Sequence, residues 1–206
     1  MTTGIGGPRA PPPLPQARNA QIEPRDLAPW IHKYADRYGV NPQIMGAIVA
    51  QESSFMNHGV HRDGTGHGLV GLDDNGLLPD FERWSGLNVG RGRRANTIAP
   101  ERQIEFLAKT LADFSERLGG SEWGAVRAWH AGMRGRNRSN GVQYEALIRG
   151  RIPEIAAAIP RVMSGAAPPE AVVASNSYSP ASREPVRLNS PEGTTPVRGG
   201  IDYEKA

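Results

Sequence analysis

The sequence predicts a mainly α-helical domain with a glycine-rich loop or small irregular sheet, flanked by two low-complexity tails. Apolar side chains recur every three or four residues in several segments, and residues that begin or end helices bound these segments. Residues 1–21 and 164–206 are instead rich in Pro, Gly, Ser and Ala and lack this periodicity. The predicted compact domain therefore spans residues 22–163, with an N-terminal arm and a C-terminal tail on either side.

The size and composition of the chain limit what it can be. Its 206 residues suffice for one domain with tails. It contains no cysteine, which excludes disulfides and thiolate chemistry. No apolar run reaches the roughly 18 residues that a membrane-spanning helix needs. The first residues, MTTGIGGPRAPPPLPQ, lack the basic start and apolar core of a secretory signal, so we expect no signal peptide.

Arginine dominates the basic side chains. The formal net charge is only +3, yet 21 of the 24 cationic residues are Arg. They cluster within residues 91–94, 134–138 and 149–151. Such clusters can bind a polyanion, such as nucleic acid or an acidic wall polymer, or can simply solubilise a surface. No nucleic-acid-binding motif accompanies them, so nucleic acid is the weaker prediction as a partner.

The first predicted helix follows the N-terminal arm. The run from Pro11 to Pro15 favours a polyproline II segment, and we expect residues 1–21 to contribute nothing to a core. Pro24 then begins a helix that ends at Gly39, a common helix C-cap. The apolar face of this helix carries Leu27, Trp30, Ile31, Tyr34 and Tyr38.

A second helix begins directly after the first, with Asn41 as its N-cap and Pro42 in its first turn. The short link predicts that the two helices pack as neighbours. Ile44, Ile48 and Glu52 recur at i, i+4 and i+8, which places Glu52 on or beside the apolar face in the last turn. Apolar surroundings and the negative end of the helix dipole both favour a protonated carboxyl group. Acid-assisted cleavage of a glycosidic bond requires such a group, although a Glu at a helix end is more often a solvated surface residue.

Residues 56–76 are rich in glycine and predict a loop or small irregular sheet. Glycine lets the backbone approach a bulky ligand closely. Three histidines, His58, His61 and His67, lie here together with Asp63, and this combination suggests zinc. Their spacing matches no standard metal motif, so we expect neither a metal nor another cofactor. We assign these histidines to hydrogen bonds in the loop or to contacts with a sugar.

Four further helical segments complete the predicted domain. Their ranges are 77–84, 100–118, 121–133 and 143–163. The clearest is the segment that begins at Pro100, because its apolar residues alternate at spacings of three and four and Gly119 and Gly120 follow it. Its apolar stripe consists of Ile104, Leu107, Leu111, Phe114 and Leu118. We expect Pro153 and Pro160 to interrupt the last segment.

Three motifs resemble, in order, those of one enzyme family. Residues 47–55 (AIVAQESSF) resemble the helix that carries the catalytic Glu in goose-type lysozymes and soluble lytic transglycosylases, where Ser also follows. Residues 66–74 (GHGLVGLDD) are similar to the glycine-rich segment of that family, and residues 127–132 (RAWHAG) to its aromatic–Asn–Ala–Gly motif. The resemblance implies an α+β lysozyme-like fold whose glycine-rich loop forms one wall of a cleft.

The resemblance also implies an enzyme that cleaves peptidoglycan at the MurNAc-β-1,4-GlcNAc bond, with Glu52 as general acid and base. A lytic transglycosylase uses the same carboxylate to activate the muramoyl 6-hydroxyl, whereas a muramidase needs water held by a second carboxylate. Asp73 matches the Asp after the glycine motif, and Asp63 lies in a loop where goose-type enzymes also place an Asp, so the choice stays open. The residues that the resemblance places against substrate are Ser53, His67, Gly68, Leu69, Gly71, Trp129 and His130.

Several positions depart from the family pattern. Val70 replaces Met, Gly71 replaces Gln and His130 replaces Asn. Loss of the Gln amide removes a polar group from beside the cleft, which favours an alternative: a non-catalytic structural or docking protein on a retained lysozyme-like scaffold. Trp129 also has two explanations, since an indole can stack on a sugar ring or fill the core.

The expected location is a bacteriophage particle. An enzyme for peptidoglycan without an export signal must reach the wall by another route, and phages either carry such enzymes in the particle or release them through a lysis pore. Tails suited to binding other chains favour a virion protein over a free endolysin. The expected partners are therefore peptidoglycan glycan strands and other virion proteins, with action in the periplasm or cell wall of the host and no membrane span.

Overall fold

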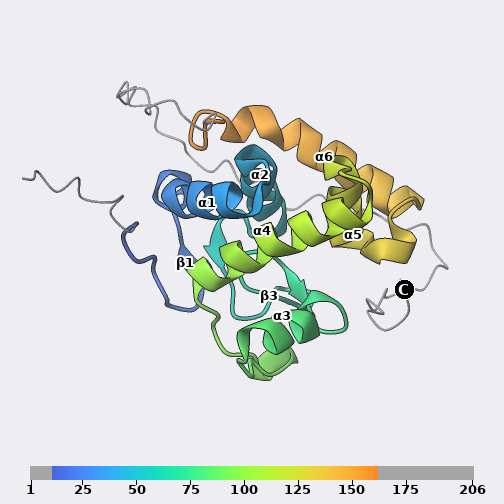
Figure 1. Ribbon diagram of the computed structural model, residues 1–206. Coiled ribbons are helices and arrows are strands. Elements are labelled where there is room, and N and C mark those ends of the chain that lie inside the picture. Colours follow the sequence, from blue (N-terminus) through green and yellow to red (C-terminus); the bar gives the residue numbers. More distant parts are fainter. Residues whose placement is uncertain (1–10, 162–206) are drawn as a thin grey trace, which may run out of the picture.

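The computed structural model describes residues 11–161, and within this range six α-helices dominate the fold (Figure 1). The helices are α1 (Pro24–Tyr38), α2 (Pro42–Ser53), α3 (Leu77–Ser85), α4 (Pro100–Arg117), α5 (Glu122–Gly135) and α6 (Ser139–Ile155), with a 3-10 turn η1 (Gly92–Arg94). The strands, each of two residues, are β1 (Ala20–Gln21), β2 (Met56–Asn57), β3 (Gly66–His67) and β4 (Leu72–Asp73). The predicted mainly α-helical class is confirmed.

Helix α2 lies at the centre of the domain and contacts α1, α4 and α6. It is apolar around nearly its whole circumference, as expected for a helix enclosed by others. Its fully buried side chains are Ile44, Met45, Ala47, Ile48 and Val49. At Gly46 an added Cβ would lie 2.5 Å from Cδ1 of Ile159, so the missing side chain lets the segment after α6 approach α2. The last turn of this buried helix carries Glu52.

The predicted junction between the first two helices is confirmed. Gly39 ends α1 in the left-handed conformation, with φ of 67°. Asn41 caps α2, because its side-chain oxygen accepts a hydrogen bond of 3.0 Å from the backbone N–H of Gln43. Helices α1 and α2 pack against each other, as the short link between them predicts.

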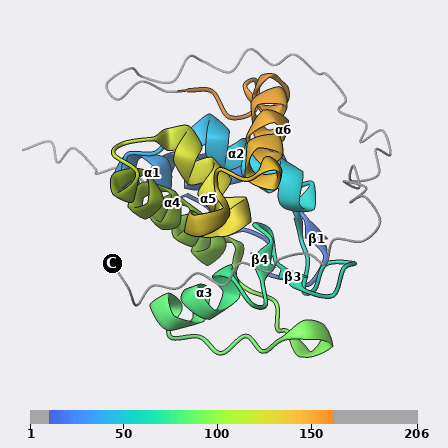
Figure 2. The ribbon, with the colours of Figure 1, turned by 90° about the vertical axis from the view of Figure 1, so that its right-hand side faces the viewer.

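The glycine-rich segment folds into two small antiparallel pairs. Strand β1 pairs with β2, and β3 pairs with β4 so that Gly66 lies opposite Asp73. Residues 68–71 connect β3 to β4, and this hairpin lies below α5 and α6 in Figure 2. Gly68 and Gly71 bound the connection with φ of 70° and 69°, a conformation that only glycine adopts without strain.

Part of the predicted N-terminal arm belongs to the domain. The side chain of Leu14 is only 5% exposed and belongs to the core. The Leu14 N–H donates to Glu101 of α4 at 2.7 Å, and the indole N–H of Trp30 in α1 donates to the carbonyl of Pro12 at 2.8 Å. The expectation that this segment adds nothing to the core is therefore corrected for residues 11–21. A proline-rich chain needs no secondary structure to place one apolar side chain against α1 and α4. The predictions for residues 1–10 and 164–206 lie outside the described residues.

Helices α5 and α6 differ from their predicted boundaries. Helix α6 begins at Ser139, four residues earlier than expected, and Pro153 does not interrupt it. This proline lies near the C-terminal end, where the helix stops two residues later at Ile155. Helix α5 runs two residues beyond the expected end and is kinked at Gly132, whose φ of 70° and ψ of 163° are not helical.

Candidate active site

Glu52 is the centre of the candidate site. It lies one residue before the end of α2 and is partly exposed. Three separate parts of the chain approach its carboxyl group: α6 through Tyr144, the β3–β4 hairpin through Gly71, and the preceding loop through Asp63. The carboxyl group is therefore sheltered, while Glu52 as a whole residue keeps part of its surface exposed.

Tyr144 is the direct hydrogen-bond partner of Glu52. Its buried hydroxyl donates to Oε1 of the carboxyl group from a position 92 residues further along the chain. Sequence reasoning placed Tyr144 within the predicted helix of residues 143–163 and gave it no role in the site. The signal that it missed is chemical, because a buried tyrosine hydroxyl requires a polar partner.

The surroundings raise the pKa of Glu52 to about 7. Burial is the main cause, since it disfavours the charged carboxylate, and the negative charge of Asp63 adds to it. The hydrogen bond from Tyr144 acts in the opposite direction and lowers the pKa. Tyr144 itself keeps its proton, because burial and the neighbouring Glu52 raise its pKa well above 10. Glu52 can therefore both give and take a proton near neutral pH.

Asp63 is an anion within electrostatic reach of Glu52. Burial alone would raise the pKa of Asp63, but backbone hydrogen bonds outweigh this effect and lower it. These bonds come from the N–H groups of Thr65 and Gly66, at 2.9 and 3.1 Å from Oδ1. The loop thus favours the ionised form of Asp63, and the negative charge of Asp63 raises the pKa of Glu52.

Asp73 occupies a different place from Asp63. It lies in β4, and its Oδ1 accepts the N–H of Asn75 at 2.9 Å, which closes the turn before α3. In the part of the chain that the structure describes, the carboxylate whose charge acts on Glu52 is Asp63. Of the two predicted carboxylates, Asp63 is therefore the one within electrostatic range of Glu52.

The two hairpin glycines are needed for close packing. A Cβ at Gly71 would lie 2.5 Å from Oε2 of Glu52, and a Cβ at Gly68 would collide with Oε1 of Gln103. Gly71 therefore sets how near the hairpin comes to the carboxyl group. The need for glycine at position 68 is explained by the close approach of the Gln103 side chain, without a ligand.

Gln103 anchors the hairpin and was not predicted. It is fully buried in α4, and its Oε1 accepts the N–H of Leu69 at 2.5 Å. Its Nε2 donates to Oδ1 of Asn57 and to the carbonyl of Ile98, both at 2.9 Å. A polar residue beside the apolar stripe of residues 100–118 is the sequence signal that indicates such an anchor.

Trp129 and His130, the two candidates from the motif at residues 127–132, lie in different surroundings. Trp129 is only 4% exposed and its ring centroid lies 6.4 Å from that of Phe106, so it belongs to the core. The exposed His130 stacks on the ring of Tyr144, with centroids 4.4 Å apart and planes within 4°. The core explanation that the sequence left open for Trp129 is the one that fits its burial.

Three residues predicted to bind substrate are buried and have structural contacts. Ser53 donates its hydroxyl to the carbonyl of Val49 at 3.1 Å, and Leu69 is fully enclosed in the core. His67, also fully buried, places Nδ1 at 3.1 Å from the carbonyl of Gly59 and Nε2 at 2.5 Å from Oδ1 of Asp74. These side chains support the hairpin and the end of α2, with Leu69 and His67 fully buried and Ser53 only 6% exposed.

The remaining histidines stabilise the loop. Nε2 of His61 lies 2.7 Å from the carbonyl of Gly68, and the rings of His58 and His61 meet edge to face at 4.8 Å. No three His, Asp or Glu side chains within residues 11–161 are grouped so that they could hold a metal ion. The contacts of His61 and His67 agree with the loop hydrogen bonds expected for them.

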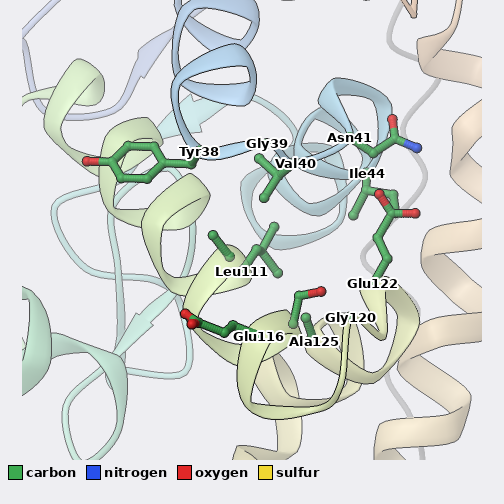
Figure 3. A pocket seen from close by; sticks show the side chains of 12 residues that line it. Tyr38, Gly39, Val40, Asn41, Ile44, Leu111, Glu116, Gly120, Glu122 and Ala125 are labelled. Carbon is green, nitrogen blue, oxygen red and sulfur yellow. The ribbon is translucent and has the colours of Figure 1, made fainter.

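A pocket in the described part of the chain lies away from Glu52. It has a volume of about 390 Å³ and is lined by residues that include Tyr38, Ile44, Leu111 and Glu116 (Figure 3). Ile44 and Glu52 are eight residues apart on α2, about 12 Å along the helix axis. We place the site at Glu52 because the perturbed acid and its partners lie there. A cleft with the hairpin as one wall stays a prediction.

A buried helix that ends in a sheltered Glu beside a glycine-rich hairpin is the arrangement that the resemblance to lysozyme-like glycosidases implies. Residues 29–152, more than half of the chain, match the family described as Transglycosylase SLT domain, and the chain belongs to this family. Its members are lytic transglycosylases, which are lysozyme-like glycosidases that act on peptidoglycan, and this protein is an enzyme of that kind. None of the helices described between residues 11 and 161 is long and apolar enough to span a bilayer.

Proposed function

We propose that this enzyme cleaves the MurNAc-β-1,4-GlcNAc bond of peptidoglycan as a lytic transglycosylase, with Glu52 as both general acid and general base. The observation that carries this proposal is the sheltered carboxyl group of Glu52 at the end of α2, which accepts a hydrogen bond from the hydroxyl of Tyr144 and whose pKa burial raises to about 7. A carboxyl group with this pKa exists in both protonation states near neutral pH, so it can serve both steps of the reaction.

In the first step, protonated Glu52 gives its proton to the glycosidic oxygen as the bond from that oxygen to the anomeric carbon of MurNAc breaks. Positive charge develops on the sugar ring and negative charge on the carboxyl group. The hydrogen bond from Tyr144 to Oε1 stabilises the carboxylate that forms, and the anionic Asp63 favours the positive charge on the sugar.

In the second step, the Glu52 carboxylate accepts the proton of the muramoyl 6-hydroxyl group. The oxygen of that hydroxyl bonds to the anomeric carbon and closes an anhydro ring. Glu52 is protonated again, and no water is consumed. A single carboxyl group is sufficient for this cycle, provided that a partner such as Tyr144 stays hydrogen-bonded to it in the protonated and the ionised state.

Hydrolysis is the second candidate reaction, and Asp63 is the observation that favours it. A second carboxylate can orient and deprotonate a water molecule that attacks the anomeric carbon. Asp63 is ionised and within electrostatic range of Glu52. The product would then be a reducing MurNAc end instead of an anhydro end.

The products of peptidoglycan digestion test these proposals. We would digest purified peptidoglycan with the protein, with Glu52→Gln and with Glu116→Gln, and determine product masses. Glu116 is an exposed Glu that lines the distant pocket and serves as the matched control. We expect anhydromuramoyl ends from the unchanged protein and from Glu116→Gln, and a loss of about 100-fold or more for Glu52→Gln. Reducing ends would establish hydrolysis, and the absence of products from every variant would contradict both proposed reactions.

We further propose that the protein is carried in a bacteriophage particle and opens the cell wall during delivery of the phage genome. The Pro-, Ser- and Gly-rich composition of residues 164–206, which suits binding to other virion proteins, supports this location. Mass spectrometry of purified virions tests it. Detection only in the soluble lysate would instead indicate a free endolysin.

A further inference from the structure

We propose that His130 is a positioning residue that holds the hydroxyl group of Tyr144 against Glu52 by stacking on the tyrosine ring. This inference rests on the proposed function, because it concerns the same carboxyl group. It assigns His130 a role inside the protein, whereas the family motif implies a contact with substrate at that position.

The ring geometry is the first support. The imidazole of His130 and the phenol ring of Tyr144 lie face to face, with centroids 4.4 Å apart and planes 4° from parallel. The tyrosine hydroxyl donates to Oε1 of Glu52. Histidine, tyrosine and glutamate thus form a continuous chain of contacts from α5 through α6 to α2.

The backbone of α5 explains why His130 can stack in this way. Successive helical residues point about 100° apart. The neighbouring Trp129 is fixed in the core against Phe106, which turns His130 toward α6. Gly132 then leaves the helical conformation, with φ of 70° and ψ of 163°. One face of the His130 ring therefore contacts Tyr144, and the rest of the side chain is exposed.

The position of the Tyr144 hydroxyl depends on the orientation of its ring. Two side-chain torsions set that orientation, and a flat neighbour at van der Waals distance restricts both. If the neighbour is removed, the ring can tilt and the hydroxyl group can leave Oε1. The Glu52 carboxylate then loses the hydrogen bond that stabilises it, and its pKa moves up.

The departure from the family motif makes the proposal specific to this chain. The resemblance places Asn where His130 stands, and an Asn side chain offers a smaller planar surface to the tyrosine ring. If stacking is the role of this position, an aromatic ring without titratable nitrogens should replace His130, and Asn should not. The variants His130→Phe and His130→Asn separate these cases.

The test measures the protonation of Glu52 directly and therefore does not depend on turnover. The protein labelled with carbon-13 at Glu carboxyl groups is titrated by NMR as the full chain, with Glu52→Gln used to assign the signal. We expect His130→Ala and His130→Asn to raise the pKa of Glu52 and His130→Phe to leave it unchanged. With soluble glycan strands as substrate, kcat should fall about two- to tenfold for Ala and Asn at unchanged KM, and recover with Phe.

Three results would overturn the proposal. If His130→Ala leaves the titration of Glu52 unchanged, the stack does not act through Tyr144. If His130→Phe is impaired as much as His130→Ala, the imidazole nitrogens are required and stacking is not the role. A rise in KM with an unchanged titration would assign His130 to substrate binding. Failure of the proposed function itself would appear as absent products with the titration shifts intact.

Discussion

At the level of single residues, the role proposed for Glu52 sets two opposing requirements. As an acid it needs shelter from water, so that it keeps its proton near neutral pH. As a base it needs a partner that stabilises the carboxylate after the proton has left. Burial supplies the first, and the hydrogen bond from Tyr144 supplies the second. The pKa of about 7 is the balance between them.

The shelter of Glu52 has a cost in stability, which gives the first prediction. The pKa in the folded protein, about 7, lies above the ordinary value of 4.5, so the folded state holds this proton more tightly than the unfolded chain. Relative to Glu52→Gln, the free energy of unfolding of the unchanged protein should therefore fall as the pH rises from about 4.5 to 7. We expect Gln to be more stable by up to about 3 kcal/mol at pH 8 and by little at pH 4. Urea denaturation at both pH values measures this, and an equal difference at both would contradict it.

The second prediction concerns Tyr144. The activity of the unchanged protein should decline on the alkaline side with a midpoint near pH 7, because the acid must be protonated. Tyr144→Phe removes the hydrogen bond that lowers the pKa of Glu52, so this midpoint should move up by about one pH unit while kcat falls. The buried Tyr34 of α1 provides the control, and Tyr34→Phe should leave the midpoint in place. The pH dependence of kcat/KM is the measurement, and a midpoint unmoved by Tyr144→Phe would exclude the role of that hydroxyl.

At the level of elements, the β3–β4 hairpin is built to approach α2. Its connection is bounded by glycines with positive φ, and its two middle residues, Leu69 and Val70, are fully buried. Gln103 fixes the connection to α4 by accepting the N–H of Leu69. The absence of a side chain at Gly71 then leaves room for the carboxyl group of Glu52.

The third prediction separates crowding from backbone strain in this hairpin. Gly71→Ala introduces both, because its φ is 69° and the new Cβ would lie 2.5 Å from Oε2 of Glu52. Gly64→Ala introduces strain alone, since φ is 80° and nothing lies within 4 Å of the new Cβ. We expect each variant to lose about 1 kcal/mol of stability or more. Activity on peptidoglycan should fall sharply only for Gly71→Ala. Equal activities of the Gly71→Ala and Gly64→Ala variants would show that a Cβ at position 71 does not crowd Glu52.

The elements that the sequence predicted well are those that local chemistry determines. Asn41 and Gly39 terminate helices through contacts within a few residues, and the apolar stripe that follows Pro100 needs only the helical period. The contact between Tyr144 and Glu52 joins residues 92 positions apart and leaves no periodic trace. Motif resemblance located Glu52 and the hairpin, but only the packing of α6 on α2 shows which side chain controls the carboxyl group.

At the level of the whole molecule, the helices enclose α2 and the N-terminal segment closes one side of the core. Residues 11–21 pack against α1 and α4 through Leu14, through the carbonyl of Pro12, and through Gln16, whose side chain donates to Glu101 at 2.9 Å. Composition predicted an arm outside the domain, because prolines cannot form its helices. One apolar residue among them is nevertheless enough to fasten the segment, and β1 continues it into the pairing with β2.

The last prediction tests whether this segment belongs to the folding unit. Leu14 is 5% exposed and packs in the core, so Leu14→Ala should lower the free energy of unfolding by about 2 to 3 kcal/mol. Leu87, which is 44% exposed, is the matched control, and Leu87→Ala should cost less than about 0.5 kcal/mol. Thermal and urea denaturation of both variants give the comparison. If residues 11–21 were an external arm, both substitutions would lower the free energy of unfolding equally little. If the segment completes the core, Leu14→Ala costs more, because truncating the Leu14 side chain leaves a cavity between this segment and the helices.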